Sequence, residues 1–140
     1  MAITVTSSQV RPVDDRCIVN TGYAGAALTV GYAGYLDASG YVQHADANAG
    51  ETESRGVGII ISSPDGETSI AAGRACGLCV FGPVGGFSGM TPGEPVYVDK
   101  TVGLLTQTKP TGGAYQRAIG YAKNAYVIMV NPESGDPDSV

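Results

Sequence analysis

Two cysteines, Cys76 and Cys79, are separated by two residues, which is the spacing of redox and metal-binding motifs. A redox pair of this kind lies at the N-terminus of a helix, where the helix dipole lowers the thiol pKa. Residues 75–82 are instead typical of a strand, and a structural zinc site needs four ligands where the chain has three Cys and one His. We therefore expect Cys17, Cys76 and Cys79 to be reduced thiols that pack as small apolar side chains. A thiol enzyme that uses Cys76 and Cys79 is an alternative, and it predicts a reactive thiol of low pKa.

His44 is the only histidine, and it stands two positions before Asp46. In a strand these two side chains share one face. A hydrolase of the Ser-His-Asp type also needs a serine on a sharp turn between a strand and a helix. The nearest candidate, Ser88 in residues 85–89, does not have the required glycine spacing. We interpret His44 as a surface residue at the end of a strand.

Most acidic residues fall in predicted loops, and none follows the spacing of a calcium-binding loop. The chain also has no phosphate-binding loop, because Gly56 and Gly58 lead into three consecutive Ile rather than into a helix. These observations predict a protein that is not an enzyme. They predict no catalytic residue, no metal ion and no cofactor.

The composition favours strands over helices. The 140 residues include 21 Gly and 8 Pro, and 15% of the residues are charged. Each Gly inside a helix destabilises it by about 1 kcal/mol relative to Ala, and the β-branched residues outnumber Leu and Met. With 43% hydrophobic residues the chain can fill a core. We predict a single compact all-β domain.

The charge distribution excludes two classes of partner. The formal net charge is −5, and the eight basic residues are spread along the chain without clustering. Because phosphate neutralisation needs basic groups on one face, we expect no direct nucleic-acid binding. Residues 75–93 carry no charge but contain six Gly and two Pro, so we expect no membrane span. Residues 1–8 lack the pattern of a signal peptide, so we expect a soluble protein made in the cytoplasm.

An internal repeat organises the middle of the chain. Residues 28–37 and 90–99 share the pattern apolar-Thr-x-Gly-x-x-x-Tyr-apolar-Asp, 62 positions apart. Two further matches follow in the same order, one between residues 40–42 and 103–105 and one between residues 55–59 and 117–121. We interpret the repeat as a strand-and-turn unit that is used twice.

The repeat places Gly and Asp at matched turns. Gly is suited to turns because it adopts a positive φ without steric cost. An Asp carboxylate at the start of a hairpin loop accepts hydrogen bonds from nearby backbone N–H groups. The predicted repeat turn positions are Gly31, Asp37, Gly40, Gly93, Asp99 and Gly103.

Short strands at intervals of about 8–12 residues indicate a barrel or sandwich, and residues 73–81 are one of the predicted strands. Residues 1–12 alternate apolar and polar side chains but have no evident hairpin partner in the chain. The last residues carry two Pro among several acids, which is typical of a disordered tail. The predicted parts are an extended N-terminal arm (1–15), a single β-barrel domain (16–131) with repeats at about 26–61 and 88–123, and a flexible acidic tail (132–140).

The repeated phrases resemble the capsid cement, or head decoration, proteins of tailed bacteriophages. The first form has Ala-Leu-Thr-x-Gly, Tyr-Leu-Asp-Ala-Ser-Gly and Gly-Val-Gly-Ile. The second has Met-Thr-Pro-Gly-x-Pro-Val-Tyr-Val, Gln-Arg-Ala-Ile-Gly-Tyr-Ala and a closing strand that ends in Asn-Pro. These segments are residues 27–31, 35–40 and 56–59 in the first form and 90–98, 116–122 and 126–132 in the second. The resemblance covers about residues 20–132.

The resemblance implies a small β-barrel of the β-tulip or SH3-like type that forms a homotrimer. It implies binding to the outer surface of the mature capsid, where the protein clamps adjacent major capsid subunits. The expected location is the virion, after synthesis in the cytoplasm of the bacterial host. The N-terminal arm is then a candidate for capsid binding, because an extended segment can add a strand to a sheet edge of the capsid protein. The residues of this hypothesis are Ile3, Thr4, Val5, Thr6 and Val10.

A virion-surface module that binds glycans or mediates adhesion is the rival interpretation. Aromatic side chains such as those of Tyr23, Tyr32 and Tyr41 are suited to contacts with sugars. A titration with soluble polysaccharide distinguishes this function from capsid binding.

Overall fold

The computed structural model describes residues 3–61, 67–133 and 138–139. Strands make up 44% of the described residues. Within the described residues the only helical element is a single 3-10 turn at Ser7–Gln9, η1. The prediction of an all-β protein is therefore confirmed.

The strands are short, with one exception. Most contain two to six residues, whereas β9 contains eleven. In chain order they are β1 (Thr4–Val5), β2 (Arg11–Pro12), β3 (Ile18–Tyr23), β4 (Leu28–Thr29), β5 (Ala33–Leu36), β6 (Val42–His44), β7 (Gly58–Ile61), β8 (Ser69–Ile70), β9 (Ala75–Gly85), β10 (Phe87–Ser88), β11 (Pro95–Val98), β12 (Leu105–Thr106), β13 (Tyr115–Gln116), β14 (Ala118–Ala122), β15 (Val127–Val130) and β16 (Asp138–Ser139).

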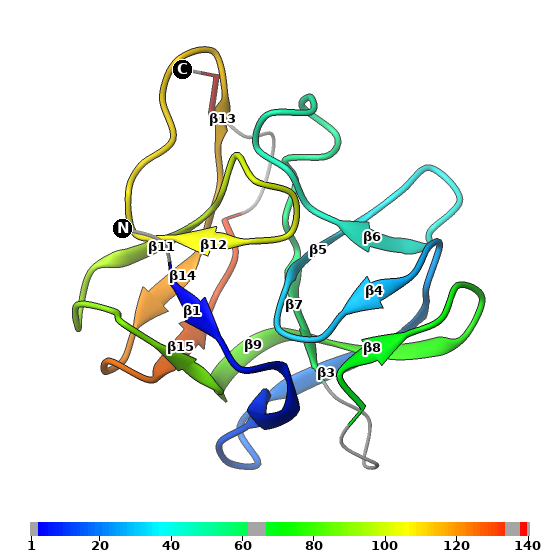
Figure 1. Ribbon diagram of the computed structural model, residues 1–140, viewed down its shortest axis with the longest axis horizontal. Coiled ribbons are helices and arrows are strands. Elements are labelled where there is room, and N and C mark those ends of the chain that lie inside the picture. Colours follow the sequence, from blue (N-terminus) through cyan, green and yellow to red (C-terminus); the bar gives the residue numbers. More distant parts are fainter. Residues whose placement is uncertain (1–2, 62–66, 134–137, 140) are drawn as a thin grey trace.

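One antiparallel sheet organises the molecule and curls into a half-barrel. Its strand order is β12-β11-β14-β15-β9-β7-β5-β6, and β2 and β3 also pair with β9. Figure 1 shows β11, β12, β14 and β15 on the left of the view and β3 to β8 on the right, with β9 running between them. The long strand therefore belongs to both halves.

Each half of β9 has a neighbour on either side. Its first half pairs with β3 and β7, and its second half pairs with β2 and β15. The sequence analysis ended this strand at residue 81, but the ladder continues through Gly82 and Pro83. Gly82 has a φ of +117°, a conformation that favours Gly. It lies where the neighbours of β9 change from β3 and β7 to β2 and β15.

The sequence repeat reappears in the strand pairing. In the first copy β5 pairs with β6 and β7, and in the second copy β11 pairs with β12 and β14. The registers also match, since Gly34 faces Gly58 just as Val96 faces Gly120, 62 positions later. The repeated pattern thus fixes not only the turns but also which residues face one another.

The predicted turn positions lie in turns with the required backbone. Gly31, Gly40, Gly93 and Gly103 all have a positive φ. The Asp37 carboxylate accepts hydrogen bonds from the Gln43 amide and from the Ser39 and Tyr41 N–H groups, which lowers its pKa. Asp99 accepts a bond from the Lys100 N–H group at 2.7 Å, and its own N–H donates to the Leu104 carbonyl.

Aliphatic side chains from both copies form the core. The largest of them are completely buried, and they come from β4, β7, β14 and β15 among other strands. Two glycines in this core permit close backbone contact. A Cβ at Gly58 would overlap the Cys79 carbonyl oxygen, and a Cβ at Gly120 would overlap the Met129 carbonyl oxygen. These residues hold equivalent repeat positions, so both copies need Gly there.

The N-terminal segment lies against the rest of the molecule. β1 pairs with β10, the Ile3 N–H donates to the Leu105 carbonyl at 3.3 Å, and β2 pairs with β9. Ile3 and Val10 are buried in the core, and Val5 packs against it. The sequence showed no partner for this segment, whereas the structure supplies two.

The described part of the C-terminal tail also contacts the barrel. The Glu133 N–H donates to the Ala118 carbonyl at 3.1 Å, and the buried Arg117 guanidinium donates to the Glu133 carbonyl. β16 pairs with β13. The other residues of the predicted tail beyond residue 133, 134–137 and 140, lie outside the described residues.

Candidate functional site

The cysteines with motif spacing lie on β9, three residues apart, so their side chains project from opposite faces of the strand. Cys76 and Cys79 are buried, Cys17 is half-buried, and all three are free thiols. The Cys79 thiol donates to the Phe81 carbonyl at 3.5 Å and also contacts the Cys17 thiol. Burial raises the pKa of each of the three thiols, most strongly that of Cys79. The packing role fits these positions, and the low thiol pKa that a thiol enzyme requires is not found.

His44 lies at the end of β6, as expected, but it is half-buried rather than on the surface. Its Nε2 accepts a hydrogen bond from the Thr29 N–H at 2.9 Å, and its ring lies 5.0 Å from that of Tyr32. The Asp46 carboxylate instead accepts a bond from the Asn48 N–H. The geometry gives His44 a structural role, joining β6 to β4.

We expect the protein to lose stability as the pH falls from about 7 to about 5, because His44 then gains a proton. Burial lowers the pKa of His44 below its ordinary value of 6.5, so the folded state disfavours the charged form. The stabilisation is complete above the unfolded pKa and declines as the pH falls towards the folded pKa. Protonation of Nε2 also removes the acceptor for Thr29.

Chemical denaturation at several pH values measures this effect. His44→Gln is the matched control, since its amide oxygen reaches the position of Nε2 and can accept the same bond without titrating in this range. Equal losses of stability in the wild type and in His44→Gln between pH 7 and pH 5 would contradict the assignment.

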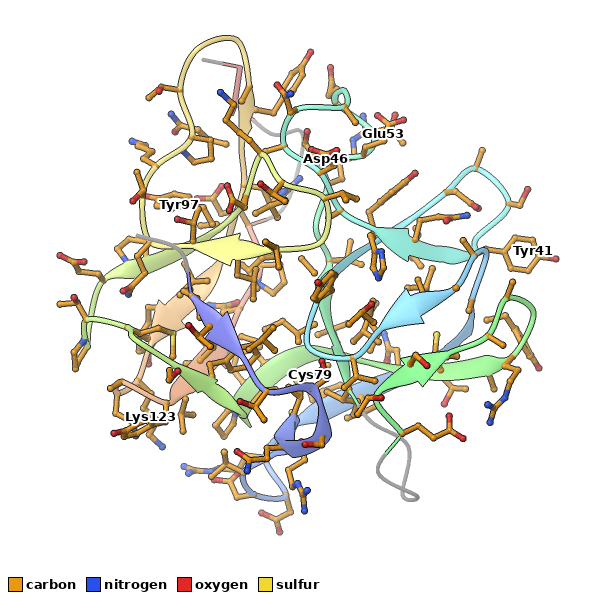
Figure 2. The ribbon with its side chains drawn as sticks, in the orientation of Figure 1. Tyr41, Asp46, Glu53, Cys79, Tyr97 and Lys123 are labelled. Carbon is orange, nitrogen blue, oxygen red and sulfur yellow. The ribbon has the colours of Figure 1, made fainter. Side chains whose placement is uncertain are left out.

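Other classes of site receive no support from the residues that the structure describes. Among them no group of three or more His, Cys, Asp or Glu side chains lies close enough to hold a metal ion. No helix within the described ranges is long and apolar enough to span a membrane. Asp46 and Glu53, labelled in Figure 2, meet in a loop where the Asp46 N–H donates to the Glu53 carbonyl.

The three tyrosines considered for sugar binding do not share one environment. Tyr23 and Tyr41 are exposed, and Figure 2 shows Tyr41 at the edge of the molecule with its ring directed outward. Tyr32 is half-buried and packs against His44 and Gly103. The set therefore provides two exposed rings rather than a platform of three.

Apolar side chains gather instead on the outer face of the main sheet, where Tyr121, Phe81 and Ile18 are exposed, Met129 is half-buried and Pro83 is buried. Tyr121 on β14 faces Met129 on β15, which in turn faces Pro83 on β9. Directly opposed residues of antiparallel strands project from the same face. Phe81 lies two residues before Pro83 and faces Ile18 on β3. We call these five residues the apolar row.

The apolar row is accessible and is flanked by charge. Ile18 is 56% exposed, Phe81 40% and Tyr121 46%. A shallow pocket of about 380 Å³ lies over the row, and Arg16 and Lys123 line it as well. Arg16 forms an ion pair with Asp14 at 2.7 Å, which lowers the pKa of the Asp14 carboxyl. Figure 2 shows Lys123 at the end of the molecule formed by β14 and β15.

This arrangement can bind another protein. A row of large apolar side chains on rigid strands supplies contact area, and the charges at its edge can orient a partner. The apolar row cannot be predicted from the sequence pattern, because β14 and β15 carry apolar residues on both faces. The only signal was the polar-free run 125–130 beside Tyr121, which does not tell the outer face from the inner one.

The residues of the N-terminal arm hypothesis lie elsewhere. Thr4 and Val5 pair with β10, while Ile3 and Val10 are covered by the chain's own core. Thr6 donates its N–H to the Gly86 carbonyl at 2.8 Å. Capsid binding through Ile3 and Val10 would require the segment to leave the barrel, whereas Thr4 and Thr6 are exposed where they lie.

Comparisons with known proteins add no family. No protein-family model matches the chain. No curated protein shows significant similarity to it in sequence.

Proposed function

We propose that the protein is a capsid decoration protein of a tailed bacteriophage. It binds the outer surface of the mature capsid as a trimer and clamps adjacent major capsid subunits, and its barrel is of the β-tulip or SH3-like type. The proposal joins the resemblance of the repeated phrases to one structural observation. That observation is the exposed apolar row on the outer face of the main sheet.

The apolar row is well suited to docking because its side chains are already ordered. Tyr121, Phe81 and Ile18 project from paired strands, so little conformational entropy is lost when they are covered. Large aromatic side chains also dominate the energy of many protein interfaces. An exposed row of this kind is a common mark of an interaction site.

The charges beside the row can set the orientation of the partner. Lys123 and Arg16 line the pocket, and Arg16 pairs with Asp14. Because Arg16 is exposed and Asp14 is partly exposed, the ion pair contributes little to stability. Its role in the proposal is to select the docking register.

Trimer formation explains how modest contacts become firm attachment. Three linked apolar rows bind with a much higher effective affinity than one. A protein that binds only the mature shell stabilises it by linkage, because binding lowers the free energy of the mature shell and not that of the immature one.

Co-sedimentation with mature and immature capsids tests the proposed function, together with the mass of the free protein by light scattering. We expect saturable binding to mature capsids, weaker binding to immature ones, and the mass of a trimer. A monomer that ignores both capsid forms would overturn the proposal. Binding to soluble polysaccharide in a parallel titration would support the glycan-binding alternative instead.

A further inference from the structure

A groove of about 390 Å³ lies between β3 and the β5–β6 hairpin. Asn20–Gly22 form one wall, Leu36 and Val42 contribute to the other, and Leu78 and Val80 of β9 also line it. Every residue that lines the groove is uncharged. The groove therefore combines an uncharged lining, apolar except for Asn20 and Thr21, with the edge of a strand.

The edge of β3 that faces the groove is unoccupied over most of its length. β3 pairs with β9 along its opposite edge. On the groove side, the described residues supply a partner only beyond the end of β3, where Ala24 bridges to Val42 and the Gly25 N–H donates to the Val42 carbonyl at 2.9 Å. Backbone groups of an unpaired strand edge are a ready template for another strand.

In the second half of the molecule, the equivalent strand edge is paired with another strand. Residues 82–85 of β9 stand 62 positions after residues 20–23 of β3, and they pair with β15 as β3 pairs with the first half of β9. Their outer edge is occupied by β2, with Arg11 facing Gly85 and the Val13 N–H donating to the Pro83 carbonyl at 3.0 Å. The chain thus covers one of two equivalent edges with its own N-terminal segment.

We infer that the Asn20–Gly22 edge of β3 accepts an extended strand from the partner protein. The inference rests on the proposed function, under which that strand belongs to the major capsid subunit. A second copy of this chain is a poorer source, because its N-terminal segment already pairs with its own β9 and β10. Backbone hydrogen bonds supply affinity in this mode, and alternate side chains enter the groove.

The groove limits the chemistry of the incoming strand. Three residues of edge correspond to roughly 10 Å of extended chain. The apolar lining favours small aliphatic side chains at alternate positions, and a charged side chain directed into the groove would be desolvated without a partner. An uncharged segment with Val, Ala or Ile at every second residue fits these conditions.

Leu36→Asp tests the inference, with Val102→Asp as its matched control. Leu36 lines the groove and is 49% exposed, while Val102 lies in a hairpin loop away from the groove and is 51% exposed. Both changes add one negative charge at a half-exposed aliphatic position. We expect Leu36→Asp to weaken co-sedimentation with mature capsids at least tenfold and Val102→Asp to leave it within twofold.

Hydrogen exchange on the wild-type protein provides a measurement that does not depend on any variant. Peptides that cover residues 18–24 should exchange at least tenfold more slowly in the capsid-bound protein than in the free protein. If the wild type binds capsids, Leu36→Asp binds equally well and this exchange is unchanged, the inference is overturned while the proposed function stands. If the wild type does not bind capsids at all, both are overturned.

Discussion

Replacing Gly120 by Ala is expected to lower the free energy of unfolding by about 3 kcal/mol, a large effect for one methyl group. The added Cβ would overlap the Met129 carbonyl oxygen, which is backbone within the β14–β15 ladder and has little freedom to move. Relief requires the two strands to separate, and this would disturb the buried Ile119 and Ile128 beside them. Denaturant unfolding followed by circular dichroism measures the change.

Gly85→Ala is the matched control for this prediction. Gly85 also lies in a strand, but its φ is not positive and a Cβ there meets only side chains, Val13 at 3.4 Å and Val127 at 4.0 Å. We expect its stability to stay within about 1 kcal/mol of the wild type. Gly58→Ala should behave like Gly120→Ala because it holds the equivalent repeat position. Wild-type stability in Gly120→Ala would show that the strands separate more readily than the structure indicates.

Replacing Tyr121 by Ala is expected to weaken capsid binding at least 30-fold, or by about 2 kcal/mol, the loss typical of a central aromatic residue in an interface. Tyr121 lies at the β14 end of the apolar row, opposite Met129, and it lines the shallow pocket together with Phe81. Its ring is 46% exposed, so its removal leaves the core intact. Co-sedimentation over a range of protein concentrations gives the affinity.

Tyr126→Ala is the control for this prediction, because it removes an exposed tyrosine that lies outside the apolar row. Tyr126 is 64% exposed and does not line the pocket over the apolar row. We expect its variant to bind capsids within twofold of the wild type. If both variants bind equally well, the apolar row is not the docking face, and the contact must be sought on another surface.

The features that sequence predicts best are local ones. Gly31, Gly40, Gly93 and Gly103 indicate turns because a positive φ is a property of the single residue. Asp37 indicates a hairpin start because its carboxylate bonds to neighbours within six positions. The repeat adds information on strand pairing, because equivalent residues of the two copies face equivalent partners.

The features that sequence did not predict depend on distant partners. Alternation in the N-terminal segment identifies an extended chain, but it does not say that β1 pairs with β10, more than 80 residues away. The sequence predicts a strand that ends at residue 81, and Pro83 has no N–H group to donate to a ladder. The ladder passes through it nevertheless, and its carbonyl accepts from Val13. The apolar row is hidden for a similar reason, since apolar residues lie on both faces of β15.

The sharing of β9 between the two halves has a mechanical consequence. A load that pulls the halves apart acts on this strand through its ladders to β3 and β7 at one end and to β2 and β15 at the other. It also acts on loop contacts between the halves, such as the bond from the Ala33 N–H to the Gly103 carbonyl at 2.8 Å. Where such a load runs parallel to the strands, the hydrogen bonds of each ladder resist together rather than opening one after another. Under the proposed function the protein holds adjacent capsid subunits together, and β9 would then carry part of the tension between them across the molecule.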